Sequence, residues 1–213
     1  MGHQSSVAAR VRRVVLDQPR TLGDGDCEAL RPGLLGQPVN TITSLGYVGV
    51  GAWLAGRSGR RAVRADRSAL AFAALTALAG AGSVAYHGPQ FAGAQFLHDT
   101  PVYGVLGVGA AVPVWRTVRG EVAVPGWSTG LGFAIAGTTA AAGAAYLAGR
   151  TTSCVCRPYS WWQFHGLWHL GTAAAMGMWG AALWPAVTDV TCGGPGDSTD
   201  EVQIALRVSD AAR

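Results

Sequence analysis

The sequence predicts an all-α protein, a polytopic integral membrane bundle of about five transmembrane helices. Of its 213 residues, 49% are apolar and only 13% are charged, and the mean hydropathy is +0.24. A helix that spans a bilayer needs about 20 largely apolar residues. The chain has five stretches of this length in which Asp99 is the only charged residue: 34–56, 68–87, 95–115, 124–148 and 160–187.

The regions on either side of these stretches are polar. Residues 1–33 form a head with turn-forming residues and an acidic, glycine-rich patch. No signal-peptide core follows its arginines, because the apolar run 14–16 ends at Asp17, so we expect the head to remain on the mature protein. We therefore predict three parts: an extracytoplasmic head at 1–33, a transmembrane catalytic domain at 34–187 and a flexible cytoplasmic tail at 188–213.

The arginines predict the orientation. Arg116 and Arg119 follow the third stretch, and five more lie between the first two: Arg57, Arg60, Arg61, Arg64 and Arg67. The opposite loops hold only Arg150 and Arg157. Cytoplasmic loops are enriched in basic residues, so we expect the N-terminus outside and the C-terminus inside, in the plasma membrane. Because these loops account for much of the positive charge, nucleic-acid binding is not expected.

Few polar residues lie inside the stretches, and they gather in one leaflet. Ser83 and His87 are four residues apart near the end of the second stretch, as are His165 and His169 near the start of the fifth. Asp99 lies near the start of the third. With five spans in alternating directions, all five residues are expected near the outer face. Polar groups in a membrane are costly, so each one is a functional hypothesis.

Three histidines with a nearby carboxylate predict a catalytic zinc site. Three neutral imidazoles, from His87, His165 and His169, hold zinc and leave its fourth position for water. Zinc lowers the pKa of that water toward about 7. Asp99 is then a candidate general base, and Ser83 is a candidate donor to an oxyanion.

Other interpretations of these residues stay open. The histidines could pack in the core, or two of them could be axial haem ligands. Ser83 could bond a carbonyl of its own helix. The protein would then be a non-catalytic membrane receptor, or a metal- or haem-binding protein, on the same scaffold.

The pattern Ser83-x3-His87, then an Asp, then His165-x3-His169 resembles the CREST superfamily of membrane hydrolases. The segment His165-Gly-Leu-Trp-His169-Leu-Gly-Thr is most similar to that of the alkaline ceramidases. The resemblance implies a zinc on the three histidines, Asp99 positioning its water and Ser83 assisting at the oxyanion. It implies hydrolysis of an amide bond in a ceramide-like lipid substrate drawn from the membrane.

Two departures from the family concern helix number and the acidic residue. The family has seven helices, and a loss of two keeps the zinc ligands on one side of the membrane. The family has its Asp three residues before a Pro, whereas here His98 is three before Pro101 and Asp99 is two before it. We expect Asp99 to fill the acidic position, with His98 as the alternative.

The head also resembles that of the ceramidases, in which acidic residues and an Asn bind calcium. The resemblance implies that calcium is a second cofactor, with four candidate ligands: Asp24, Asp26, Glu28 and Asn40.

The cysteines fit the expected orientation. Cys27, Cys154 and Cys156 are all expected outside, where disulfides persist, so Cys27 is expected to pair with Cys154 or Cys156. A zinc site at Cys154-x-Cys156 would lack two ligands. Cys192, on the inner side, is expected to be a free thiol.

Overall fold

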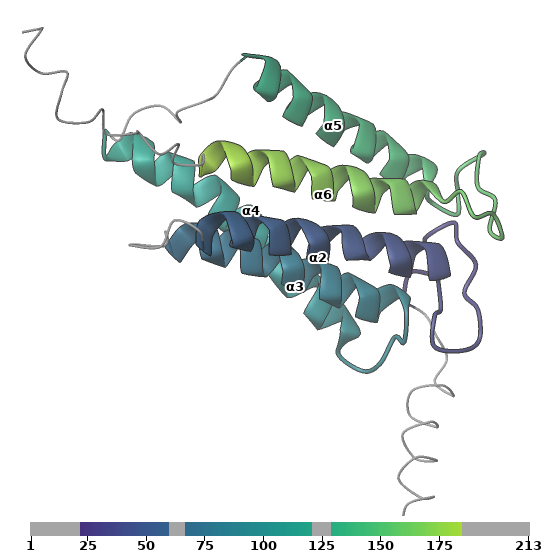
Figure 1. Cartoon of the computed structure of the whole chain (residues 1–213). Helices are drawn as coiled ribbons and strands as arrows, with labels where there is room; N and C mark the ends of the chain where they lie inside the picture. The colour runs from purple at the N-terminus through teal and green to yellow at the C-terminus, as the bar shows by residue number, and fades with distance from the viewer. Residues whose placement is uncertain (1–21, 60–66, 121–128, 185–213) are drawn as a thin grey trace, which may run out of the picture.

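The computed structural model describes residues 22–59, 67–120 and 129–184, and this part of the chain is helical (Figure 1). Its helices are α2 (Pro38–Gly59), α3 (Arg67–His87), α4 (Ala94–Val118), α5 (Thr129–Ala148) and α6 (Phe164–Leu183). These residues form no strand, only an isolated bridge between Asp26 and Arg150. The predicted all-α class is confirmed, with one helix in each of the five apolar stretches.

Parts of the predicted organisation lie outside the described residues. These parts are the start of the head, at 1–21, and the tail at 188–213 with Cys192. Three of the arginines that predict the orientation are also outside: Arg60, Arg61 and Arg64.

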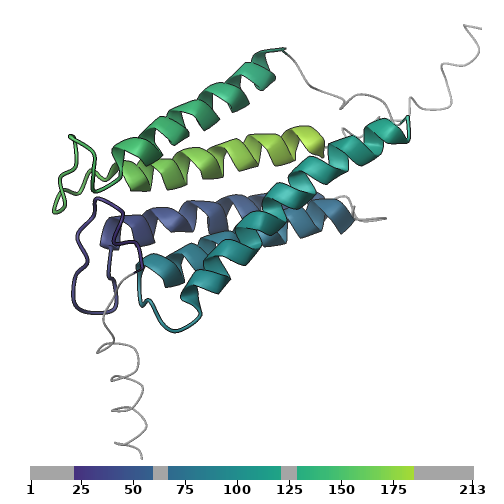
Figure 2. The same ribbon diagram turned by 180° about the vertical axis from the view of Figure 1, so that it is seen from behind.

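The helices form a bundle that is open between α4 and α5. Helix α2 packs against α3 and α6, α3 packs against α4, and α5 packs against α6. No Cα atom of α4 lies within 8 Å of a Cα atom of α5 in the parts of these helices that the structure describes. Figure 2 shows that segment 22–37 and loop 149–163 lie at the same end of the bundle. The backbone N–H of Gln37 donates to the carbonyl of His87 there, over 2.8 Å, which joins the start of α2 to the end of α3.

Two glycines of α3 allow its neighbours to approach closely. A Cβ atom on Gly80 would lie 2.8 Å from the backbone nitrogen of Val48 on α2. A Cβ atom on Gly82 would overlap the backbone carbonyl of Leu97 on α4. Small residues of this kind let helix backbones pack tightly, as is common in membrane bundles. They bring α2, α3 and α4 together beside Ser83 and His98.

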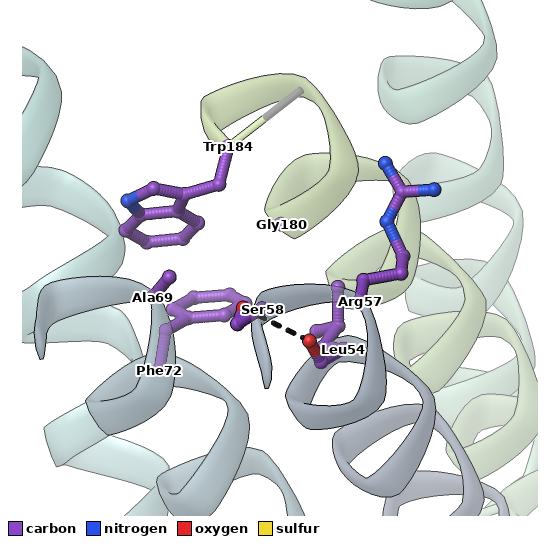
Figure 3. Close-up of a pocket in the computed structure, with 7 residues that line it drawn as sticks. All are labelled: Leu54, Arg57, Ser58, Ala69, Phe72, Gly180 and Trp184. Carbon is purple, nitrogen blue, oxygen red and sulfur yellow. Dashed lines mark hydrogen bonds between the residues drawn. The ribbon is translucent and has the colours of Figure 1, made fainter. Parts of the chain in front are cut away.

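The opposite end of the bundle is closely packed. Figure 3 shows the side chains of Phe72 and Trp184 there. Their ring centroids are 5.3 Å apart, and Leu183 is fully buried. Ser58 Oγ donates to the carbonyl of Leu54, over 3.0 Å. The small cavity among these side chains holds about 10 Å³, which is about the space of one water molecule. The bundle is therefore nearly filled at this end.

Among the described residues, two helical segments are long and apolar enough to cross a membrane, Arg67–His87 and Gly130–Ala148. Helices α2, α4 and α6 carry polar side chains that lower their hydropathy, among them Asn40, Asp99 and His165.

A disulfide ties the two connecting segments together. Cys27 is bonded to Cys156, which is one of the two pairings that the sequence left open, while Cys154 is exposed and free. Beside the disulfide, the N–H of Ala29 donates to the carbonyl of Pro158, over 2.9 Å. Segment 22–37 is thereby fixed over one end of the bundle.

We expect Cys27→Ser to lower the thermal stability of the protein. The disulfide links residues 129 positions apart, and loss of such a link typically costs about 2–5 kcal/mol. Circular dichroism of detergent-purified protein should show a lower Tm for Cys27→Ser, and for wild type after reduction. Cys154→Ser is the matched control and should keep the wild-type Tm. Equal Tm values for the two variants would contradict the prediction.

Candidate metal centre

Three imidazoles converge between the end of α3 and the start of α6. His87 is the last residue of α3, while His165 and His169 lie one helical turn apart on α6. All three side chains are buried, and their ring centroids are 4.7 to 5.2 Å apart. One nitrogen from each ring lies within 4.8 Å of the others. The predicted set of three histidines is therefore assembled, and it is close enough to hold a metal ion.

The hydrogen bonds of Gln37 determine which nitrogen of His87 is free. Gln37 Nε2 donates to the carbonyls of Gly23 and Glu28, each over 2.8 Å, so its Oε1 is an acceptor. This Oε1 lies 2.6 Å from His87 Nδ1, which must therefore be the donor. A neutral His87 then leaves Nε2 with a free lone pair.

His169 is held in the same way by a backbone carbonyl. Its Nδ1 lies 3.1 Å from the carbonyl oxygen of Asn40, which can only accept a hydrogen bond. Thr43 Oγ1 and Ser44 Oγ lie 3.2 and 3.3 Å from the same nitrogen. Neutral His169 therefore also presents Nε2 as its available ligand atom.

His165 differs from the other two because its Nδ1 is buried without a hydrogen-bond partner. Asp26 Oδ1 lies 3.2 Å from this Nδ1 atom. All three Nδ1 atoms thus face an oxygen, and three Nε2 atoms remain. Histidines that bind a metal usually donate their other N–H to such an oxygen, so these residues fit a metal ion.

Ser83 lies one turn before His87, in a network of buried hydroxyl groups. Its Oγ is 2.8 Å from Ser44 Oγ, and Ser44 Oγ lies 2.6 Å from the carbonyl oxygen of Asn40, to which it can donate. If Ser44 instead donates to Ser83, the Ser83 proton is free to point into the cavity that this side chain lines. Ser83 thus reaches the site predicted for it.

His98 and Asp99 lie together in the wall of the same cavity. His98 Nδ1 is 2.7 Å from Asp99 Oδ1, and both side chains are partly exposed. The His98 ring centroid is 4.8 Å from that of Tyr86 and 6.5 Å from that of His87. The two candidates for the acidic position are therefore a hydrogen-bonded pair beside the histidines, and which of them acts stays open.

A cavity of about 770 Å³ leads from the histidines between the helices. Ligand pockets commonly have volumes of about 300–1,000 Å³. Both α4 and α5 line the cavity although they lie apart. Beyond the histidines its wall is mainly apolar, and includes Val105, Leu106, Ala110, Ile135, Met176 and Trp179. The site therefore joins one polar end to a long apolar chamber.

The four candidate calcium ligands have different surroundings. Asp24 is exposed, whereas Asp26 is buried and accepts a 2.8 Å hydrogen bond from Arg150 Nη1. Burial raises the pKa of Asp26 to about 6, although Arg150 opposes this shift. The Asp26 carboxylate is therefore ionised at neutral pH and is already paired with a cation.

Glu28 caps the start of α2. Its two carboxylate oxygens accept the backbone N–H groups of Val39 and Asn40, each over 2.8 Å. These bonds satisfy donors that an α-helix leaves free at its N-terminus. Asn40 Oδ1 is buried without a partner. The calcium site stays a prediction.

The structure adds residues that sequence analysis missed. Ser44 is four residues after Asn40, the same spacing as Ser83 and His87, and this spacing was a usable signal. Gln37 shows no such pattern. Arg150 was used only as a marker of orientation, although its guanidinium lines the cavity.

No protein-family model, curated protein or solved structure matches this chain.

We expect detergent-purified protein to contain about one metal ion per chain. The ion should be lost in each of three variants, His87→Ala, His165→Ala and His169→Ala, because each change removes one of the three candidate ligands. Metal content by mass spectrometry is the measurement. His98→Ala is the control from the same cavity and should retain the ion. A folded wild type without metal, or an equal loss in His98→Ala, would contradict this assignment.

Proposed function

We propose that this protein is a zinc-dependent integral membrane hydrolase that cleaves an amide bond in a ceramide-like lipid. The observation that carries the proposal is the cluster of three buried histidines at the head of a large apolar cavity. Three imidazoles are the ligand set of a zinc with an open position, whereas axial haem ligation uses two ligands. The resemblance of this pattern to the alkaline ceramidases supports the same reaction.

Exposed apolar side chains support a membrane location for the whole bundle. Large hydrophobic residues are exposed on every helix, including Ile42 on α2, Leu78 on α3 and Phe133 on α5. Soluble monomers rarely expose large contiguous apolar patches, whereas a surface in contact with lipid is apolar. We propose that all five helices span the bilayer, in addition to the two that meet the length and composition test.

The disulfide supports an extracytoplasmic metal centre. Disulfides are rare in the reducing cytosol. The Cys27–Cys156 disulfide lies at the end of the bundle that holds the histidines, because Asp26, the residue before Cys27, is 3.2 Å from His165. We therefore place this end at the outer face of the plasma membrane.

The chain supplies a proton acceptor and a hydrogen-bond donor beside the metal centre. When bound, zinc supplies a water of lowered pKa and a Lewis acid for a carbonyl oxygen. Asp99 accepts a proton there, directly or through His98, whose Nδ1 lies 2.7 Å from Asp99 Oδ1. Ser83 Oγ donates to the oxygen that gains negative charge. Asp99, which is then protonated, returns the proton to the nitrogen of the leaving amine as the amide C–N bond breaks.

The shape of the cavity suits a lipid. Its apolar wall accommodates an acyl chain, and its polar end holds the reactive groups. Because α4 and α5 lie apart, the acyl chain of the lipid can reach the histidines sideways from the bilayer.

We expect purified protein to hydrolyse lipid amides. Mass spectrometry of the released fatty acid measures this activity. Asp99→Asn should lower kcat about 10²–10⁴-fold, the usual contribution of general acid–base catalysis, while retaining the metal. His98→Ala should have a smaller effect if Asp99 is the base itself, and the reverse order would assign that role to His98. A metal-loaded wild type without turnover on any lipid amide would favour a non-catalytic receptor.

Labelling of single cysteines tests the orientation. In Cys192→Ser protein the free thiol is Cys154, since Cys27 and Cys156 are bonded to each other. A membrane-impermeant maleimide should label this variant on intact cells. Cys154→Ser, in which Cys192 is free, should be labelled only after permeabilisation. The opposite pattern would reverse the orientation.

A further inference from the structure

Asp26 places a buried carboxylate against two of the three histidines. It lies in segment 22–37, outside the helices, and is only 4% exposed. Its Oδ1 is 3.2 Å from His165 Nδ1, and its Oδ2 is 3.9 Å from His87 Nδ1. The sequence had suggested calcium for this residue, but its oxygens face imidazole rings and a guanidinium group.

His165 Nδ1 is the one ring nitrogen of the three histidines that is buried and unpartnered. The 3.2 Å distance to Asp26 Oδ1 is already suitable for a hydrogen bond, so the geometry at the ring, not the separation, keeps the pair from meeting the hydrogen-bond criteria. When Nε2 of a neutral imidazole binds a metal, Nδ1 carries the proton and needs an acceptor.

We propose that Asp26 is a positioning residue of the metal centre, whose carboxylate accepts the Nδ1 proton of His165 and orients this ligand. The proposal rests on the metal site proposed above, and it holds whichever bond the enzyme cleaves. Gln37 and Asn40 give the other two histidines neutral acceptors. His87 Nδ1 lies much closer to Gln37 than to Asp26, so His165 is the histidine whose Nδ1 has a carboxylate as its nearest acceptor. A carboxylate makes the stronger hydrogen bond and raises the basicity of the ligand.

The segment around Asp26 is built to hold this contact. The backbone N–H of Cys27 donates to the carbonyl of Gly149, and that of Thr151 donates to the carbonyl of Gly25. A Cβ atom on Gly25 would overlap the guanidinium of Arg150, so glycine leaves room for Arg150 in its present position. The disulfide of Cys27 adds a covalent link directly beside Asp26.

Arg150 holds the Asp26 carboxylate in place, and the negative charge of Asp26 balances the positive charge of Arg150. Arg150 Nη1 donates to Asp26 Oδ1 over 2.8 Å, and the guanidinium lies 5.4 Å from the centre of the Tyr146 ring. If Asp26 lost its charge, this cation would remain next to His165 and would repel a metal dication. Asp26 thus both orients a ligand and neutralises Arg150.

The test is the zinc affinity of detergent-purified full-length protein, measured by competition with a chelator. Asp26→Asn should weaken binding about 10–100-fold, the usual effect of losing such an acceptor. Asp24→Asn is the matched control, because it removes the same charge from the same segment at an exposed position, and it should stay within about twofold of wild type. Asp26→Glu, which keeps the carboxylate, should recover part of the affinity.

A second readout separates positioning from loss of fold. At saturating cobalt(II), only folded, metal-loaded protein contributes to the visible absorption bands, and Asp26→Asn should shift them. The double variant Asp26→Asn/Arg150→Gln should bind zinc more tightly than Asp26→Asn alone, because the unpaired cation is gone.

The outcomes distinguish this proposal from the proposed function. If wild type binds zinc and Asp26→Asn has the same affinity and cobalt spectrum, the role of Asp26 is overturned and the metal centre stands. A defect that appears only when calcium is added would also overturn it, in favour of a calcium role. If wild type binds no zinc, both fail. If zinc binds as expected but no lipid amide is cleaved, only the hydrolase proposal fails.

Discussion

Three buried imidazoles impose the main constraint on this structure, because each must keep one nitrogen free and still find an acceptor for the N–H of the other. A buried donor without an acceptor costs about 1–3 kcal/mol. The acceptors are the Gln37 side chain for His87, the Asn40 carbonyl for His169 and, in our proposal, the Asp26 carboxylate for His165. All three come from segment 22–37 or the first turn of α2. The disulfide of Cys27 therefore supports the histidine cluster as well as the fold, because it holds the segment whose acceptors orient the histidines.

The same constraint explains the close packing of helices at this end. Ser83 reaches Ser44 on α2 only because Gly80 lets α2 and α3 approach, and His98 lies beside α3 because Gly82 leaves room for the start of α4. In lipid, where apolar side chains gain little from contact with one another, such close approach and interhelical hydrogen bonds stabilise a bundle. The glycines and the polar network thus support the same arrangement, and neither would hold the histidines by itself.

Away from the histidines the packing changes character, and this change suits the proposed reaction. Helices α4 and α5 both line the cavity although they lie apart, and α5 packs only against α6 among the described helices. A site with polar groups at one end and an open apolar chamber can hold a reactive head group and an acyl chain together. The far end is filled by Phe72, Leu183 and Trp184, so the depth of the chamber is limited there.

The sequence by itself determined the helices and the three histidines that meet between them. Long uncharged stretches and the four-residue spacings of Ser83–His87 and His165–His169 are local signals, because they follow from helix geometry and the width of a bilayer. Two helices, α4 and α5, separate His87 from His165, so the chain returns to the same end of the bundle and the histidines meet there. Only the tertiary structure decided that Cys27 pairs with Cys156, that Gln37 and Ser44 support the ligands, and that Asp26 faces His165. These contacts depend on the path of segment 22–37 across the bundle, and no periodic pattern in the sequence encodes that path.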